Sequence, residues 1–376
     1  MPKRPSFAAA SLLLLGTLTI AHAETVELPS LDAVKESLQF DAARASMSRE
    51  NRFPHSASDW SLATGSDGRT LRLISLAGSG RPAYTVYLYF PKNAAGPVPL
   101  VLVTPLPVKH RKSMLGYCER TVVKKGMACA YLEADISPWE MLDSMKSEDP
   151  QASVAALTLF RGTVLNTIEA GEIALDALGA DPRVDPNRIG AAGFSLGGIM
   201  ASLMAQRDAR IKTLALIFSG ADLADIVMTK KEGNKQWEAQ LGGFRTGLAK
   251  ATNNEDPDQL KNYLEREFSD IEPMNGIDDM RDVPTFMANP RKDELIPKSA
   301  VDGYRAALQA SGVLLSSYIV PLDFHVPTKR KMFWLTVAHL KSGIAAMHRL
   351  DSSGDFLLEH LNDAESKSSP LRGSAE

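Results

Sequence analysis

RIGAAGFSLGGIMASLMA, residues 188–205, passes from an apolar strand pattern to a small-residue helical pattern at one serine, Ser195. Its centre, GFSLG, fits G-x-S-x-G, in which glycines leave room for a sharp turn between strand and helix. Such a turn lifts the serine hydroxyl above a sheet edge and points the N-terminus of the following helix at it. With a strand before it and a helix after it, the pattern predicts that Ser195 is a nucleophile and not an ordinary turn residue.

The chain around this stretch alternates short apolar runs with helical segments. A predicted β-hairpin comes first, with its strands at 70–76 and 83–91. The later apolar runs lie at 98–105, 127–135, 189–194, 211–220, 283–290 and 314–321. Strands that are apolar on both faces and separated by helices are typical of a mostly parallel sheet with helices on both sides. The sequence therefore predicts an α/β fold whose strand ends and loops meet at one ligand-binding edge.

The N-terminal residues 1–23 have the pattern of a secretory signal. Lys3 and Arg4 precede an apolar run, and the small residues Ala21-His22-Ala23 follow it. The apolar run is shorter than the ~20 residues that span a bilayer, and no later segment is long enough. We therefore expect export to the periplasm or outside the cell, without a stable membrane span; a retained anchor or lipid tether is the alternative.

The remaining chain divides by composition. Residues 24–69 are a predicted leader segment, and residues 70–350 form the predicted α/β domain. Within it, residues 221–282 interrupt the strand–helix alternation with polar, helix-prone sequence, which predicts an inserted cap or lid. Residues 351–376 are polar and are predicted to be a disordered tail.

Charge and cysteine content exclude several classes of function. Without residues 1–23 the chain has 40 Lys and Arg against 45 Asp and Glu, a net charge of −5, which gives no support to nucleic-acid binding. Cys118 and Cys129 are the two cysteines, and the sequence leaves open whether they form a disulfide or are buried thiols. The chain lacks C-x-x-C, H-E-x-x-H and Cys/His clusters, so we expect neither a metal nor a cofactor.

A serine nucleophile needs a histidine base and an acid that orients the base. In this architecture the acid and then the histidine follow later strands in the chain. Asp293, with Glu294 beside it, follows the run 283–290, and His325 follows the run 314–321. Asp222, one strand earlier, is the alternative acid.

The other histidines fit the role of base less well. His22 lies in the signal, His55 and His110 precede the serine, and His339, His348 and His360 fall in or after the last helix.

Two backbone N–H groups are expected to bind the oxyanion that forms on the attacked carbonyl. One belongs to Leu196, directly after the nucleophile. The other should come from the loop TPLPVKH after the strand at 98–105, where Pro105 and Pro107 have no N–H to donate. Leu106 is therefore the predicted donor, with Val108 as the alternative.

These features resemble the α/β-hydrolase family over residues 70–350, most closely its dienelactone-hydrolase-like and prolyl-oligopeptidase-like esterases and peptidases. The resemblance rests on GFSLGG, DPNRIG and KDELIP, and on a histidine after the last strand. It implies an α/β-hydrolase fold with Ser195 as nucleophile, Asp293 as acid and His325 as base. The chain departs from the family where TPLP replaces the usual HG or HGGG element, which affects the oxyanion site.

The sequence predicts an exported serine hydrolase that cleaves a small-molecule carboxylic ester through an acyl-enzyme intermediate. A serine peptidase or an acyltransferase would use the same triad, and a catalytically inactive hydrolase fold used for binding is the alternative from another class. Two basic clusters, at 109–112 and 328–331, fall in loops at the same predicted edge. They are either solvated surface or a rim that attracts anionic substrates.

Overall fold

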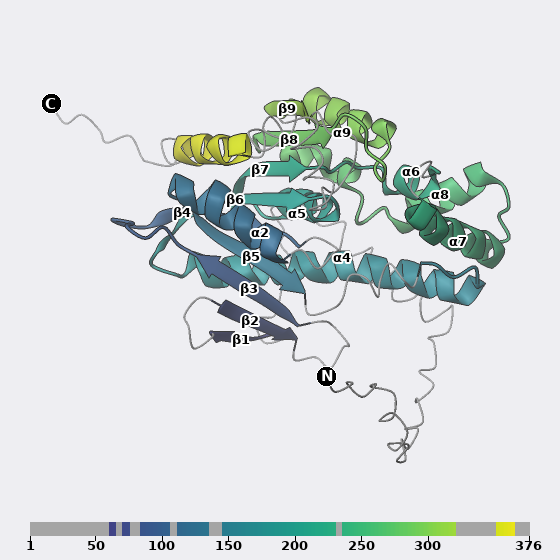
Figure 1. The fold of residues 1–376 in the computed structure, drawn as a ribbon, viewed down its shortest axis with the longest axis horizontal. Coiled ribbons are helices and arrows are strands. Elements are labelled where there is room, and N and C mark those ends of the chain that lie inside the picture. The colour runs from purple at the N-terminus through teal and green to yellow at the C-terminus, as the bar shows by residue number, and fades with distance from the viewer. Residues whose placement is uncertain are drawn as a thin grey trace, which may run out of the picture.

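The computed structural model describes residues 60–64, 70–75, 83–105, 111–134, 145–230, 235–320 and 351–364. Nine strands in these ranges form one sheet in the order β1-β2-β3-β5-β4-β6-β7-β8-β9 (Figure 1). The strands are β1 (Trp60–Thr64), β2 (Thr70–Ser75), β3 (Tyr84–Tyr89), β4 (Val98–Val103), β5 (Ala128–Ala134), β6 (Val184–Phe194), β7 (Ile211–Ile217), β8 (Thr285–Pro290) and β9 (Leu315–Val320).

The sheet is antiparallel at its N-terminal side and parallel elsewhere. β1, β2 and β3 pair antiparallel in sequence, and β3 pairs antiparallel with β5. Every pairing from β5 through β4, β6, β7 and β8 to β9 is parallel. The predicted hairpin is therefore confirmed as β2 and β3, and the predicted mostly parallel sheet is confirmed as well.

The sheet begins earlier than the sequence suggested. Residues 60–64, which we assigned to the leader segment 24–69, form β1 and pair with β2 from Trp60 opposite Ser75 to Thr64 opposite Leu71. The five-residue run WSLAT is too short to stand out by its pattern alone, and it becomes a strand because the edge of the hairpin offers it backbone partners.

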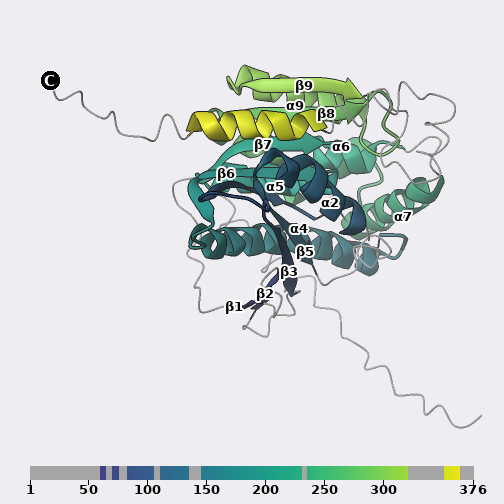
Figure 2. The ribbon, with the colours of Figure 1, turned by 60° about the vertical axis from the view of Figure 1, so that its left-hand side comes forward.

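Helices cover both faces of the sheet (Figures 1 and 2). They are α2 (Arg111–Tyr117), η2 (Cys118–Val122), η3 (Val123–Lys125), α4 (Pro150–Gly179), α5 (Leu196–Arg207), α6 (Leu223–Met228), α7 (Lys235–Thr252), α8 (Pro257–Glu267), η4 (Pro273–Met280), α9 (Lys298–Ala310) and a helix at 351–364. Alternate residues of β4 show the two layers. Leu100 and Leu102 belong to the buried cluster that includes residues of α4, α5 and α9, whereas Val101 and Val103 belong to the cluster that includes residues of α2 and the helix at 351–364.

The helix at 351–364 corrects the predicted disordered tail over that range. Leu357 and Leu361 are completely buried in it, and Ser353 forms a buried hydrogen bond of 2.8 Å with the Tyr117 hydroxyl. Its apolar residues are few and lie among charged ones, so the overall composition looked polar. Their helical spacing nevertheless gives one apolar face, which covers the α2 side of the sheet.

The two cysteines form a disulfide, which settles the question that the sequence left open. Cys118 in η2 is joined to Cys129 near the start of β5, with their Cα atoms 5.5 Å apart. Both residues are buried in the layer on the α2 side. The bond therefore fixes the helical segment that follows α2 against the strand that it precedes.

Four helical elements, α6, α7, α8 and η4, lie between β7 and β8, within the segment 221–282 that was predicted to be a cap. In Figure 1, α6, α7 and α8 group beyond the arrowheads of β6 and β7, which are the carboxyl ends of those strands. Within the described ranges, no helix has the length and apolar character needed to cross a membrane.

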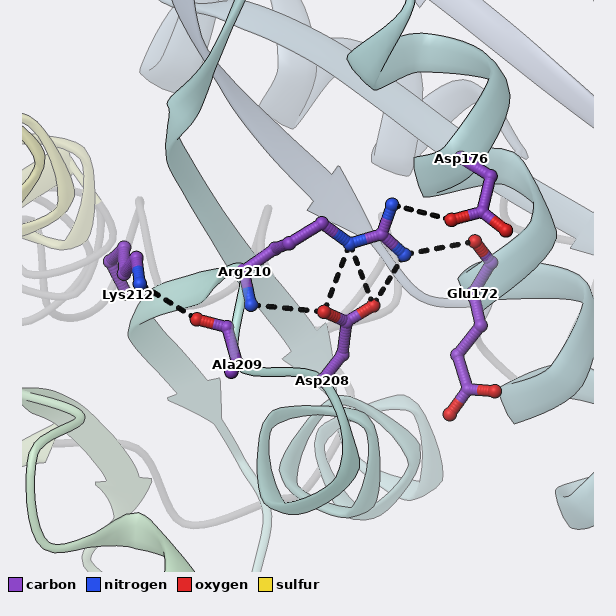
Figure 3. A network of polar contacts seen from close by, with 6 residues as sticks. All are labelled: Glu172, Asp176, Asp208, Ala209, Arg210 and Lys212. Carbon is purple, nitrogen blue, oxygen red and sulfur yellow. Dashed lines mark hydrogen bonds and ion pairs between the residues drawn. The ribbon is translucent and has the colours of Figure 1, made fainter. Parts of the chain in front are cut away.

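A partly buried polar network lies at the opposite edge, where β7 begins (Figure 3). Arg210 binds Asp208 and Asp176 at 2.6 Å each and donates to the backbone oxygen of Glu172 at 3.3 Å. Burial raises the pKa of the Glu172 carboxyl to about 7. Perturbed pKa values often mark catalytic groups, but this network precedes β7 at its amino end. We therefore interpret it as structural, joining α4 to the turn between α5 and β7.

Candidate active site

Ser195 lies in the turn between β6 and α5 and has an unusual backbone conformation. Its φ is 54° and its ψ is −126°, a combination that L-residues rarely adopt. The Ser195 N–H donates to the Ile217 carbonyl of β7 at 2.9 Å, which holds the turn at the end of the sheet. Such conformations cost of order 1–3 kcal/mol and are typical of functional sites. The turn has the position and geometry that the sequence predicted.

The glycines around Ser195 are required by close approach of neighbouring chain segments. A Cβ on Gly193 would overlap the Gly197 carbonyl, and a Cβ on Gly197 would lie 2.6 Å from the Pro105 carbonyl oxygen. A Cβ on Gly198 would lie 2.5 Å from the Cβ of Ser219, which follows β7. The sequence GFSLGG therefore meets β4 on one side and β7 on the other, and neither contact leaves room for a side chain.

Leu196 is the first residue of α5. N–H groups in the first turn of a helix have no acceptor within the helix, and the dipole of the helix places partial positive charge at this end. The Ser195 carbonyl accepts from the Gly198 N–H at 2.8 Å and so closes the first turn. The Leu196 N–H thus has the position expected of an oxyanion donor, and its role stays a prediction.

Thr104 is a residue at this site that the sequence analysis missed. It is completely buried at the end of β4, and its hydroxyl lies 2.5 Å from the Gly197 carbonyl oxygen and 3.2 Å from that of Ala192. These bonds fix the start of TPLP against the first turn of α5. The available signal was a hydroxyl residue at the point where the family has its HG element. The predicted donor Leu106 lies outside the described residues.

Asp293 lies in the loop between β8 and α9. Its Oδ1 accepts the N–H groups of Leu295 at 2.8 Å and Ile296 at 2.9 Å, which fixes the carboxylate in a tight turn. The loop leaves the carboxyl end of β8, and β8 is separated from β6 by β7 alone. Asp293 therefore lies at the same edge of the sheet as Ser195. The predicted base, His325, lies outside the described residues, so the triad stays a prediction.

The alternative acid, Asp222, has contacts that belong to the cap. It adopts a left-handed conformation and caps α6, where its Oδ1 accepts from the Asp225 N–H at 2.9 Å. Its own N–H donates to Glu272 at 2.9 Å, and Lys261 lies 3.9 Å from its carboxylate. These contacts account for an acidic residue at this position without a catalytic role, so Asp293 remains our predicted acid.

Arg111 and Lys112 are the two residues of the basic cluster at 109–112 that the structure describes. Arg111 forms an ion pair of 2.5 Å with Glu133 and lies over the Tyr87 ring, 5.1 Å from its centroid. The hydrogen bond to Glu133 raises the pKa of Arg111. Because this charge is neutralised locally, Arg111 attracts an anionic substrate less than the sequence suggested. The second cluster, 328–331, lies outside the described residues.

Comparison with known proteins agrees with this geometry at the level of the fold. No family model matches the chain, and no curated protein matches it by sequence. Acylaminoacyl peptidase from Pyrococcus horikoshii matches with a TM-score of 0.50 and 14% identity, over 80% of this chain and 42% of that one. An acylaminoacyl peptidase in complex with Z-Gly-Gly-Phe-chloromethyl ketone matches with a TM-score of 0.50 and 16% identity, over 82% of this chain and 44% of that one. A 2,6-dihydroxy-pseudo-oxynicotine hydrolase matches with a TM-score of 0.48 and 13% identity, over 89% of this chain and 76% of that one.

The chain thus spans less than half the length of the acylaminoacyl peptidases that it matches. At these identities the likeness concerns architecture. The strand order, the layers and the turn at Ser195 agree with it: the chain has the α/β-hydrolase fold, as the sequence motifs predicted.

Proposed function

We propose that this protein is an exported serine hydrolase that cleaves carboxylic esters of small molecules. The observation that carries the proposal is the backbone of Ser195, which has φ 54° at a strand-to-helix turn. Glycines pack this turn against the two neighbouring strands. A conformation of that cost is unnecessary for a turn that only connects two elements, and it is expected where a hydroxyl must project from the sheet edge.

In the proposed reaction, the Ser195 oxygen attacks the ester carbonyl while His325 accepts the hydroxyl proton. Asp293 orients His325 and stabilises the imidazolium. The carbonyl oxygen becomes an oxyanion bound by the N–H groups of Leu196 and Leu106. The carbon–oxygen bond to the alcohol then breaks, and the alcohol leaves with the proton from His325. Water, deprotonated by His325, hydrolyses the acyl-enzyme and returns the serine.

Export is part of the proposal. Residues 1–23 have the composition of a secretory signal. The Cys118–Cys129 disulfide supports the same conclusion, because disulfides form and persist mainly in oxidising compartments. Expression with the signal intact, followed by separation of periplasm, medium and cytoplasm, tests this point. Recovery of the uncleaved chain from the cytoplasm alone would contradict export.

Labelling with a fluorophosphonate probe tests the nucleophile. We expect wild type to label and Ser195→Ala to remain unlabelled. Ser219→Ala is the matched control, since Ser219 also follows a strand at this edge but is completely buried, and this variant should label like wild type. If folded wild-type protein fails to label, the enzyme proposal is wrong, and a binding role for the hydrolase fold becomes the better interpretation.

A substrate panel then identifies the reaction class. Matched 4-nitrophenyl esters and 4-nitroanilides of the same acyl groups separate an esterase from a peptidase. Added alcohols reveal acyl transfer by competition with water. We expect ester hydrolysis to dominate; faster cleavage of the anilides would favour the peptidase alternative.

A further inference from the structure

Asn289 is the second-last residue of β8, at the edge of the sheet that carries Ser195. Its side chain is 3% exposed, and its Nδ2 donates to the carbonyl oxygen of Ser219, which follows β7, at 2.6 Å. The partner fixes the orientation of this amide, because a carbonyl oxygen only accepts hydrogen bonds and would repel the amide oxygen at this distance. Asn289 therefore joins the carboxyl ends of two neighbouring strands through a side-chain donor.

This bond lies where the backbone pairing of β7 with β8 ends. The register of the two strands ends with Ile217 opposite Ala288, and the Phe218 N–H donates to the Ala288 carbonyl at 2.7 Å. Phe218 has φ 54°, a left-handed conformation that is rare for a bulky residue, so the chain bends away from the direction of the strand. Beyond this bend, the side chain of Asn289 supplies the hydrogen bond between the two strand ends.

The segment that Asn289 binds supports the turn at Ser195 from the β7 side. The Ile217 carbonyl accepts the Ser195 N–H at 2.9 Å. Two residues later, Ser219 packs so closely on Gly198 that a Cβ there would lie 2.5 Å from the Ser219 Cβ. The Gly198 N–H in turn donates to the Ser195 carbonyl at 2.8 Å. A displacement of this segment would therefore disturb the turn at two points.

The same segment also contacts the loop that carries Asp293, four residues after Asn289. The Asp293 Oδ1 accepts the Ile296 N–H at 2.9 Å, which orients the carboxylate within its own loop. Ile296 packs closely on Gly220, where a Cβ would lie 3.1 Å from the Ile296 Cγ2. Residues 217–220 thus lie between the turn of Ser195 and the loop of Asp293, and Asn289 fixes their position relative to the strand from which that loop leaves.

A second buried bond of the same kind provides the contrast. Thr213 in β7 is completely buried, and its hydroxyl donates to the carbonyl of Pro284, directly before β8, at 3.1 Å. This bond joins the same two strands at their amino ends, at the opposite edge of the sheet from Ser195. Two side-chain donors therefore clamp one strand pair at its two ends, and the bond from Asn289 is the one at the proposed active site.

We propose that Asn289 is a positioning residue that holds the loop of Asp293 at a fixed place relative to the turn of Ser195. The inference rests on the proposed function, in which His325 must reach the Ser195 hydroxyl and the Asp293 carboxylate at the same time. Asn289 acts on this reaction through Asp293 and not through the substrate. The geometry tolerates little displacement, since an error of about 1 Å can lower the rate about 10²-fold.

Two variants separate positioning from stability. Asn289→Leu and Thr213→Val each remove one buried hydrogen bond between β7 and β8, so both should lower the midpoint in urea. We expect Asn289→Leu to lower kcat about tenfold with KM within about twofold of wild type, and Thr213→Val to keep kcat near wild type. Asn289→Ala repeats the test without the bulk of leucine if Asn289→Leu does not fold.

Two results would overturn the positioning role. One is a wild-type kcat in a folded Asn289 variant. The other is an equal loss of kcat in Thr213→Val, because the effect would then follow from weaker pairing of the strands at either end.

A double-mutant cycle with Asp293→Asn tests the route of the effect. If Asn289 acts through the Asp293 carboxylate, Asn289→Leu should lower kcat about tenfold in the wild-type background but less than about twofold in Asp293→Asn, where the positioned group is already lost. The rate of labelling with the fluorophosphonate probe extends the measurement to the slow variants. An equal factor in both backgrounds would indicate a general loosening of the site and overturn the proposal.

These outcomes separate the inference from the function on which it rests. If wild type cleaves no ester and the fluorophosphonate probe fails to react, the proposed hydrolase activity is wrong. If Ser195 labels and Asp293→Asn lowers kcat, but Asn289→Leu leaves kcat unchanged, the hydrolase activity stands and the positioning proposal alone is wrong.

Discussion

Replacing Thr104 with valine tests whether the end of β4 positions the oxyanion site. Valine has nearly the shape of threonine but lacks the hydroxyl, so the buried contacts of Thr104 persist while its hydrogen bonds to Gly197 and Ala192 are lost. The segment TPLP begins at Thr104, and the predicted donor Leu106 is two residues further on. We therefore expect the loop to lose its alignment with the first turn of α5.

The magnitude follows from the contacts. A buried hydrogen bond contributes about 1 kcal/mol net, and a carbonyl left without its donor adds a desolvation cost of similar size. Thr104→Val should therefore lower the free energy of unfolding by about 1–2 kcal/mol. Complete loss of one oxyanion donor lowers kcat by about 10²–10³. A displaced donor retains part of that effect, so we expect kcat to fall about tenfold with KM nearly unchanged, because the oxyanion forms only in the transition state.

Steady-state hydrolysis of a 4-nitrophenyl ester, with urea unfolding in parallel, measures both effects. Thr104→Ser retains the hydroxyl and is the matched control, for which we expect kcat within about threefold of wild type, since a serine hydroxyl offers the same donor and acceptor capacity. A Thr104→Val enzyme with wild-type kcat would refute the positioning role. A rise in KM at constant kcat would refute it as well, since that pattern indicates lost substrate binding.

Three further predictions follow from the described contacts. Asp293→Asn should lower kcat about 10⁴-fold, as expected for a triad acid. Asp222→Asn retains a good capping residue for α6 and should keep a kcat near that of wild type. The reverse result in steady-state assays would make Asp222 the acid. Replacing Cys118 and Cys129 with serine should lower the free energy of unfolding by about 3 kcal/mol, the value for a loop this short, and unchanged urea midpoints would contradict that. Burial raises the pKa of Glu172 from 4.5 to about 7, so the folded state retains a proton that the unfolded state releases. The protonated Glu172 carboxyl therefore contributes fully to the free energy of unfolding below pH 4.5, and this contribution is lost as the pH rises through 7. Wild-type stability in urea should therefore fall from pH 5 to pH 8 more than that of Glu172→Gln, and parallel profiles would refute this.

Local pattern was enough to predict the sheet and the turn at Ser195. The strands β4 to β8 are apolar on both faces, and that property is visible in single short runs. The turn needs small residues on both sides of the serine, and the glycines are part of the sequence itself. These features could be predicted from the sequence because they depend on residues only a few positions apart in the chain.

Features that depend on distant partners were not predictable in the same way. The hydroxyl of Thr104 has a role only because Gly197, 93 residues later, lies beside it. The helix at 351–364 is stabilised because its few apolar residues pack against the α2 side of the sheet. The pairing of Cys118 with Cys129 required the geometry of η2 against β5, since their spacing alone allowed free thiols as well.

The contacts around Ser195 explain how a strained turn persists. β6 lies between β4 and β7 in the sheet, and each neighbour contributes to holding the turn. On the β4 side, Thr104 binds the Gly197 carbonyl, and on the β7 side, Ile217 accepts the Ser195 N–H while Ser219 packs on Gly198. Contacts from the two neighbouring strands of the central sheet therefore hold the strained conformation in place.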